Sequence, residues 1–383
     1  MAVTNAHAVR MHASAEGTFN ALPVFVAGDG VAHIQADLGP TQTQRKSHRQ
    51  DRTGTRSPSL ALVHGQKFPV SASFSRSIAP GTTTTMDTHE ILGNALSLST
   101  STYTVAANPT DSFALQLADA DQTYADYLAG CVVESWGVEW GDPEPIETFG
   151  ILAARRGNLA KTTLNTTVND SETTFIFDEP ERFVNAYGAT VIIEAEAIDL
   201  SNTVADWTFA ASTVTVANCT RSSGGTSNAA HTAPKDVSPY VLASTTAGVP
   251  IGEQEVSLTY NGVAYVSTEG SITFNTGRAL REMERGNTFS AGVINNRLEA
   301  TFSFSGIMDQ GTDADLPGHA LLNETGALVL TIGTTATSIM TITVAVAEVE
   351  VSQPWPDDDP LRFEVTGIGY GSSGNDDIQV VMS

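Results

Sequence analysis

Two copies of one pattern, a strand followed by a polar loop and a short helix, occur in this chain with the same internal spacing. Phe74 precedes a Gly/Thr turn and the sequence His-Glu-Ile-Leu at 89–92. Phe304 precedes an Asp/Gly turn and the sequence His-Ala-Leu-Leu at 319–322, and the interval from phenylalanine to histidine is the same in both. An ordered set that recurs in this way indicates tandem duplication of one structural unit.

The same succession of segments continues after each helix. An apolar strand is followed by a longer strand, by a turn rich in proline and acidic residues, and by a closing strand. The strands are 113–117, 132–140 and 146–152 in the first set and 328–332, 339–350 and 361–368 in the second. We therefore place a first β domain, with an N-terminal arm, at 1–160 and a second at 251–383. Residues 161–250 are expected to form a β insertion that ends in a flexible connector rich in Ser, Gly and Asn.

Strand signals dominate the sequence between these landmarks. Short alternating or β-branched runs are separated by Gly, Asn and Pro turns, and Asn261-Gly262 is typical of a tight hairpin. Helical periodicity is confined to residues 86–96 and to a weaker segment at 320–324. The chain is therefore expected to be all-β, with one or two short helices.

The charge balance argues against one class of function. The 383 residues include 19 Lys and Arg against 43 Asp and Glu, which gives a formal net charge of −24. Such a surface repels other polyanions, so tight binding of duplex DNA is disfavoured. Many acidic residues with few lysines are typical of proteins from high-salt, halophilic hosts, although GC-rich coding also depletes lysine.

Motifs for catalysis, metal binding and membrane insertion are not found. Cys131 and Cys219 lie far apart without CxxC spacing, so neither a disulfide framework nor a zinc site is expected. No apolar run is long enough for a membrane helix, and the first residues lack the apolar core of a secretory signal, so we expect synthesis in the cytoplasm. The sequence contains no P-loop, no Gly-x-Ser-x-Gly elbow and no metalloprotease motif. We expect no enzymatic activity, no cofactor and no bound metal.

One basic segment departs from the acidic background. It holds five cationic side chains within a predicted loop: Arg45, Lys46, Arg49, Arg52 and Arg56. Arginine can pair with a carboxylate through two parallel hydrogen bonds, so we expect this loop to dock on an acidic face of a neighbouring subunit. A solvated loop and a contact with DNA are the alternatives.

Two acidic turns offer partners for this basic loop. Their residues are Asp142, Glu144 and Glu147 in the first set and Asp357, Asp358 and Asp359 in the second. Clustered carboxylates also suit Ca²⁺, but their spacing does not fit an EF-hand. Because prolines flank both segments, solvated turns are the favoured alternative to an acceptor site.

Several motifs resemble the tail tube proteins (major tail proteins) of long, flexible-tailed viruses of bacteria and archaea. The sequence Gly-Cys-Val-Val-Glu-Ser-Trp at 130–136 is similar to a recurring strand of that family, and 374–378 is similar to its closing turn and strand. The loop leading into 53–57 and the unit of strand, loop and helix also match. The likeness covers nearly the whole chain except the N-terminal arm and the insertion. The second copy differs in lacking a loop like 53–57 and in its weaker helix.

The resemblance implies tandem β-sandwich or barrel domains that complete a β-barrel channel when subunits form a ring. Because the chain carries two copies, three chains are expected to make a ring with pseudo-sixfold symmetry, and such rings stack into a tube. The family implies further partners: a tape measure protein in the lumen, tail terminator and distal tail proteins, and double-stranded DNA that passes without specific binding. The implied location is the virion tail, assembled in the host cytoplasm without a membrane partner.

Two other functions remain open from the sequence. Sequons such as those at Asn165 and Asn169 fit a glycosylated cell-surface adhesion module built on a β-sandwich. A virion decoration protein or a tail terminator would share the β-rich composition. Those proteins decorate or cap an assembly, so they should not form open stacks.

Overall fold

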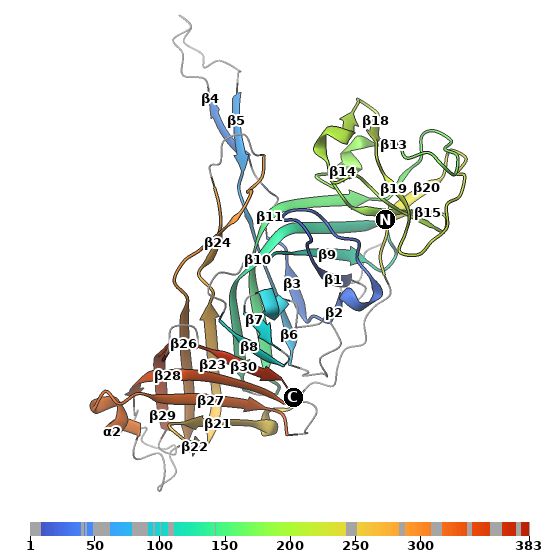
Figure 1. Ribbon diagram of the computed structural model, residues 1–383. Coiled ribbons are helices and arrows are strands. Elements are labelled where there is room, and N and C mark those ends of the chain that lie inside the picture. The colour runs from blue at the N-terminus through green and yellow to red at the C-terminus, as the bar shows by residue number, and fades with distance from the viewer. Residues whose placement is uncertain are drawn as a thin grey trace, which may run out of the picture.

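Strands dominate the computed structural model, which confirms the all-β class expected from the sequence. Long strands cross the middle of the molecule, the region 161–242 lies at one end, and a short helix lies at the other (Figure 1). The structure describes residues 9–39, 42, 44–48, 62–78, 91–94, 96–99, 101–105, 111–141, 143–242, 251–282, 288–307, 316–334, 339–352, 362–372 and 377–382.

The first copy of the repeat extends over residues 9–160. A 3-10 turn, η2 (Ala27–Asp29), follows its first strand, and residues 91–94 are helical. Its strands are β1 (Val9–Ala15), β2 (Gly30–Val31), β3 (Gln35–Asp37), β4 (Gln44–His48), β5 (Leu62–Lys67), β6 (Val70–Ser77), β7 (Ser97–Ser99), β8 (Thr102–Thr104), β9 (Phe113–Asp119), β10 (Tyr124–Trp140) and β11 (Ile146–Ala160).

The insertion carries sheets of its own. A five-stranded sheet has the order β12-β20-β15-β16-β19, and a three-stranded sheet has the order β13-β18-β17. Its elements are β12 (Thr162–Thr163), β13 (Phe175–Asp178), η3 (Pro180–Arg182), β14 (Phe183–Val184), β15 (Thr190–Ile193), β16 (Glu196–Asp199), η4 (Val204–Asp206), β17 (Trp207–Phe209), β18 (Thr213–Val216), β19 (Thr220–Ser223) and β20 (Asp236–Pro239). Whether the three segments of the chain fold as separate units stays a prediction.

The second copy extends over residues 251–382. It contains one α-helix, α2 (Leu316–Leu321), and a 3-10 turn, η5 (Glu253–Glu255). Its strands are β21 (Val256–Tyr260), β22 (Val263–Tyr265), β23 (Ser267–Asn275), β24 (Arg278–Leu280), β25 (Val293–Asn295), β26 (Glu299–Ile307), β27 (Gly326–Ile332), β28 (Met340–Ser352), β29 (Arg362–Tyr370) and β30 (Gln379–Met382).

Strand pairing is the same in the two copies. In the first copy the antiparallel pairs give the order β2-β1-β9-β10-β11-β6-β3. In the second copy they give β22-β21-β27-β28-β29-β26-β23, with each strand in the corresponding place along the chain. The repeat seen in the sequence therefore corresponds to a repeated sheet topology.

Two strand pairings join the copies to each other. Residues 135–140 of β10 pair with residues 270–275 of β23, on the edge of β10 opposite β11. The C-terminal strand β30 pairs with both β28 and β8. One hydrophobic core cluster continues through this junction and includes Trp136, Phe149, Phe274 and Phe302.

The helix expected at 320–324 lies earlier in the chain, at Leu316–Leu321. Pro317 occupies the first turn, where its missing N–H is not needed. Asn323 has a left-handed φ of 52°, and the N–H of Glu324 donates to the carbonyl of His319 at 2.9 Å, which ends the helix. Of the helix expected at 86–96, residues 91–94 are helical, and 86–90 and 95 lie outside the described residues.

The backbone conformation at position 130 explains the glycine that begins the 130–136 motif. Gly130 has a φ of +63° at an irregularity between β9 and β10, and an added Cβ would lie 2.7 Å from Ala154. Its N–H donates to Glu16 Oε1 at 2.7 Å. Burial raises the pKa of Glu16 to about 7 despite hydrogen bonds from Ser112 and two backbone N–H groups. Only glycine fits this position without strain.

Candidate functional site: the polar face of a continuous sheet

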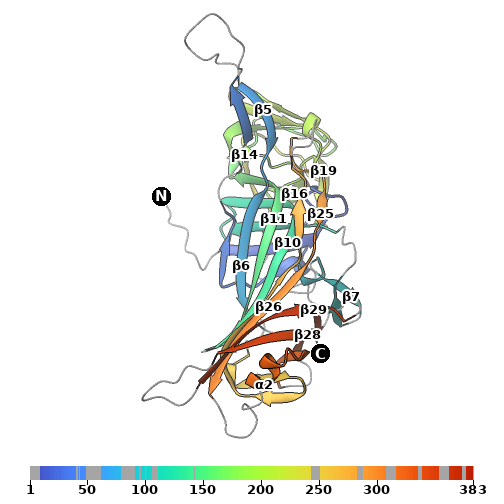
Figure 2. The ribbon, with the colours of Figure 1, turned by 90° about the vertical axis from the view of Figure 1, so that its left-hand side faces the viewer.

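Eight strands from both copies form one continuous antiparallel sheet. Their order is β3-β6-β11-β10-β23-β26-β29-β28, and the β10–β23 ladder lies at its centre. Figure 2 shows β6, β11 and β10 side by side along the molecule. One row of directly opposed residues crosses all eight strands through Gln35, Ser75, Thr148, Gly137, Thr273, Thr301, Ile368 and Glu348.

One face of this sheet is buried. The neighbouring row points into the core because side chains alternate between the two faces of a strand. It is formed by Ala36, Phe74, Phe149, Trp136, Phe274, Ala300, Gly369 and Ala347. Phe74 and Phe149 stack with ring centroids 4.9 Å apart across β6 and β11. This packing fixes which side chains must lie on the opposite face.

The other face is polar, and most of its charged groups are carboxylates. Hydroxyl side chains alternate along β6 and β26, where Ser71, Ser73, Thr301 and Ser303 point away from the core. Exposed carboxylates lie on five of the strands, β10, β23, β26, β28 and β29: Glu139, Glu269, Glu299, Glu348, Glu350 and Glu364. Arg362 is an exposed cation at the start of β29. The described part of this face is therefore predominantly negative.

Shallow grooves follow the same face. One groove of about 620 Å³ is lined by Ser271, Ser303, Glu348 and Glu350, among others. A second, of about 440 Å³, is lined by residues that include Glu139, Glu269 and Glu364. Their walls come from β23, β26, β28 and β29, with Glu139 and Trp140 added from β10. These open, acidic grooves lack the enclosed apolar shape of most small-molecule sites.

Both edges of the eight-stranded sheet are unpaired among the described strands. At one edge, β3 pairs with β6 and has no partner on its other side. At the other edge, residues 348–352 of β28 pair with β29 only, because β27 ends its ladder at Ala347. An open strand edge is a template for pairing with a further strand.

The structure corrects the assignment of Glu147 to an acidic acceptor turn. Glu147 belongs to β11, and its side chain is 0% exposed. The guanidinium of Arg76 pairs with it, and Trp136 Nε1 donates to its Oε2 at 3.1 Å. A carboxylate in this position holds β6, β10 and β11 together and is not available to another subunit.

The other candidate acceptors are only partly described. Glu144 lies in the turn between β10 and β11, half-buried, and accepts a hydrogen bond from Ser77 Oγ at 3.0 Å. The remaining acidic candidates lie outside the described residues: Asp142, Asp357, Asp358 and Asp359.

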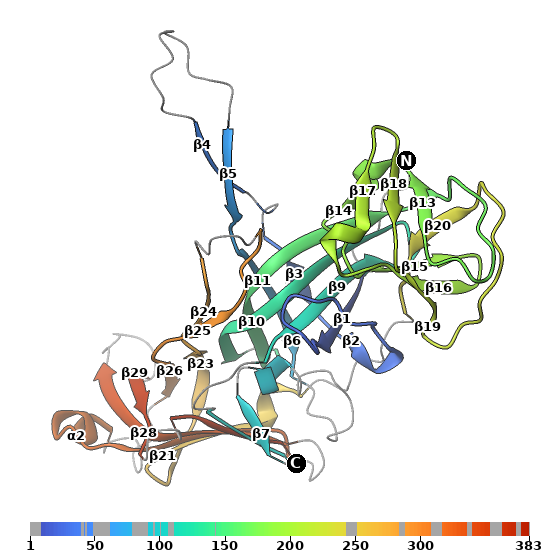
Figure 3. The same cartoon turned by 45° about the horizontal axis from the view of Figure 1, so that its top comes forward.

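Two of the five basic candidates lie on a hairpin. Arg45 and Lys46 belong to β4, which pairs with β5, and this hairpin projects away from the sheets (Figures 1 and 3). The other three candidates, Arg49, Arg52 and Arg56, lie outside the described residues.

Sequence reasoning missed a matching hairpin in the second copy. β24 and β25 pair with each other between β23 and β26, as β4 and β5 do between β3 and β6. The two hairpins touch: the N–H of Lys67 donates to the Thr288 carbonyl, and Gln66 Nε2 donates to the Phe289 carbonyl, both at 2.8 Å. The two hairpins correspond because each lies between corresponding strands of its copy. They share no sequence pattern that would reveal this correspondence.

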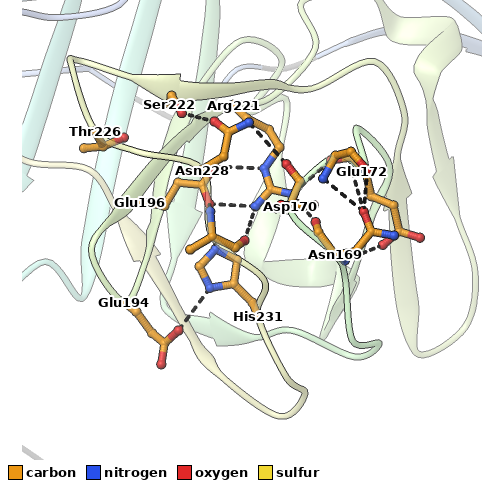
Figure 4. Close-up of polar contacts among 12 residues, drawn as sticks. Asn169, Asp170, Glu172, Glu194, Glu196, Arg221, Ser222, Thr226, Asn228 and His231 are labelled. Atoms are coloured by element: carbon orange, nitrogen blue, oxygen red, sulfur yellow. Dashed lines mark hydrogen bonds and ion pairs between the residues drawn. The ribbon is translucent and has the colours of Figure 1, made fainter.

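A network of buried charges organises the insertion (Figure 4). Arg221 pairs with Glu196 through Nη2 and Oε2 at 2.6 Å, and the two side chains are 4% and 1% exposed. His231 Nε2 lies 2.9 Å from the same Oε2, and the Ala229 N–H donates to it at 2.9 Å. Ser222 bonds to Asn228. The stretch expected to be a flexible connector is therefore tied to this network, although 243–250 lie outside the described residues.

Acid should weaken the insertion through Glu196. Burial alone would raise the pKa of this carboxyl, but hydrogen bonds from Arg221, Ala229 and His231 outweigh burial and lower the pKa to about 2. A depressed carboxyl pKa adds stability that is complete above the unfolded value near 4.5 and is lost as pH falls toward 2. We expect a loss of about 2 kcal/mol over that window, measured by urea unfolding followed at Trp207.

A control separates this carboxyl from the rest of the protein. Glu196→Gln should be destabilised at pH 7 and should lose less stability than the wild type between pH 4.5 and 2. Asp236→Asn is a matched variant, because Asp236 is exposed and pairs only with Lys161 at the surface. Equal acid sensitivity in the wild type and Glu196→Gln would contradict the assignment.

Within the described ranges, no group of three or more His, Cys, Asp and Glu side chains is placed to hold a metal ion. No helix in the described part of the chain has the length and apolarity needed to cross a membrane. No family model matches this chain, and no curated protein matches it.

Proposed function

We propose that this protein is the subunit of a virion tail tube, in which three chains form a ring and rings stack around a channel for DNA. The observation that carries the proposal is the continuous eight-stranded sheet, which has one buried face, one acidic face and two open edges. The resemblance of residues 130–136 and 374–378 to tail tube proteins supports the same function.

Barrel geometry favours three chains in each ring. Strands lie about 4.8 Å apart, so eight strands closed on themselves would enclose a space that side chains fill. Two chains would make a barrel about 25 to 30 Å wide between backbones, which side chains on both walls narrow below the roughly 20 Å width of duplex DNA. Three chains give about 24 strands and roughly 40 Å, which leaves room for the duplex.

The acidic face suits the wall of such a channel. Duplex DNA carries a dense row of phosphates, and a wall of carboxylates repels them, so the polymer slides without binding. Residues such as Glu269, Glu348 and Glu364 would face the lumen in this arrangement. The tape measure protein would occupy the same channel before the DNA enters.

Stacking would use the hairpin β4–β5 and the segment that connects its strands. In this proposal Arg49, Arg52 and Arg56 contact the adjacent ring, while Arg45 and Lys46 lie at the base of the hairpin. Cationic side chains on an acidic protein give directional contacts between identical rings. Tail terminator and distal tail proteins would close the two ends of the tube.

Electron microscopy of the purified protein tests this function. We expect hollow tubes or stacked rings at high and low salt, and native mass measurement of single rings should give three chains. A chain that stays monomeric at high concentration, or one that makes closed oligomers that never stack, would contradict the proposal. Those results would instead favour the decoration protein or the cell-surface module.

A further inference from the structure

The two helices of the repeat differ sharply in exposure although they occupy corresponding positions. Ile91 and Leu92 follow the repeat histidine of the first copy and are both 0% exposed. Leu321 and Leu322 occupy the same positions in the second copy and are 83% and 67% exposed. Two adjacent leucines with this exposure form an apolar patch beside the open edge of the second copy.

The second copy contacts the end of the first helix. Arg278, at the start of β24, is 2% exposed, and its Nη1 donates to the carbonyl and to Oδ1 of Asn94, each at 2.6 Å. Its Nη2 donates to the carbonyl of Asp111 at 2.7 Å. Next to this contact, β23 extends the sheet from β10. The helix end, the base of a hairpin and a strand ladder therefore form one joint between the copies.

Each part of this joint has a counterpart elsewhere in the chain. The counterpart of the β10 edge is the open edge of β28 at residues 348–352, and the counterpart of β23 is β3. The counterpart of the first helix is α2 with Leu321 and Leu322, and the counterpart of β24 is β4. The chain thus carries both halves of a second joint, at opposite ends of its sheet.

We propose that this second joint forms between chains: α2 and the open edge of β28 dock on β3 and the base of the β4–β5 hairpin of another copy. The contact is heterologous and head-to-tail, so it closes into a ring when the rotation permits. Charge agrees with it, because Glu324 stands at the position of Asn94, and Arg45 and Lys46 lie at the start of β4. The inference rests on the proposed ring and names the surfaces that close it.

The test changes two leucines that are exposed in the single chain and should therefore contribute little to its stability. The double variant Leu321→Asp/Leu322→Asp should keep the circular dichroism spectrum and urea midpoint of the wild-type subunit. Its association between chains, measured by analytical ultracentrifugation, should weaken about 100-fold or more. The control Val204→Asp/Phe209→Asp changes two exposed apolar residues of the insertion, 54% and 48% exposed, and should associate like the wild type.

Hydrogen exchange supplies a second measurement. Amides at 35–37 and 348–352 should exchange more slowly in rings than in subunits, while the paired amides of β1 and β9 should not change. Rings formed equally well by the leucine variant, or unchanged exchange at both edges, would overturn the inference and leave the tube function standing. If the wild type forms oligomers that the leucine variant does not form, and these oligomers never stack, the joint between chains would be supported and the tube function contradicted. A wild type that never associates would overturn both.

Discussion

Replacement of Glu147 by alanine is expected to lower the free energy of unfolding by about 4 kcal/mol. The carboxylate is fully buried and pairs with Arg76, so its removal leaves a guanidinium without its counter-charge in the core. Trp136 also loses the acceptor of its indole N–H, and an unsatisfied buried donor adds to the cost. Urea unfolding followed by tryptophan fluorescence measures the change, because Trp136 lies at the site.

Two variants distinguish the buried pair from a general effect of removing a carboxylate. Glu144→Ala removes the acid of the turn that precedes β11, which bonds only to Ser77 in the described structure, and should cost less than about 0.5 kcal/mol. Arg76→Met/Glu147→Met removes both charges and should be more stable than Glu147→Ala, since no unpaired charge remains. Similar stability of Glu147→Ala and Glu144→Ala would show that the pair contributes little.

The contrast between these two glutamates shows how far sequence reasoning reached. A cluster of Pro and acidic residues predicts a turn, and Glu144 lies in that turn. Glu147 belongs to the strand that follows, on the same face as Phe149 and Ile151. Alternation over these residues carried the signal for burial, but a charged residue at the edge of a turn is assigned to solvent unless the strand boundary is known.

The duplication was detectable because both copies keep local patterns in the same order. Phe74 and Phe304 each mark a strand in which alternate residues are apolar, and this pattern depends only on which face meets the core. The hairpins β4–β5 and β24–β25 share no such pattern, because neither pairs with the main sheet. Their equivalence appears only when the strands that flank them have been paired.

For the candidate site, the sequence predicted the acidic charge but not the position of the charged residues. The excess of carboxylates predicted a surface that repels polyanions, but the face that carries Glu348 and Glu364 depends on the register among β26, β28 and β29. The open edge of β28 is still harder to predict, since it depends on where the β27 ladder ends. Leu321 is likewise 83% exposed, and no local pattern distinguishes it from the buried Ile91 at the same position of the first copy.

The junction between the copies determines whether the eight strands act as one sheet, and Gly270 is its most restrictive position. It lies on β23 opposite Trp140 of β10 and Phe304 of β26. A Cβ added here would lie 2.3 Å from the indole ring of Trp140 and 2.6 Å from the carbonyl oxygen of Ser303. Backbone on one side and a buried ring on the other leave no direction in which a methyl group fits.

Gly270→Ala is therefore expected to cost about 3 kcal/mol in the free energy of unfolding and to shift the emission of Trp140. Gly141→Ala is the matched control, because its Cβ would make ordinary contact with Glu269 at 3.6 Å, and it should cost less than about 1 kcal/mol. Because the proposed joint between chains repeats the joint at Gly270, a changed angle here should also prevent ring closure. A Gly270→Ala protein with wild-type stability and normal rings would show that the junction tolerates displacement and does not set the curvature of the sheet.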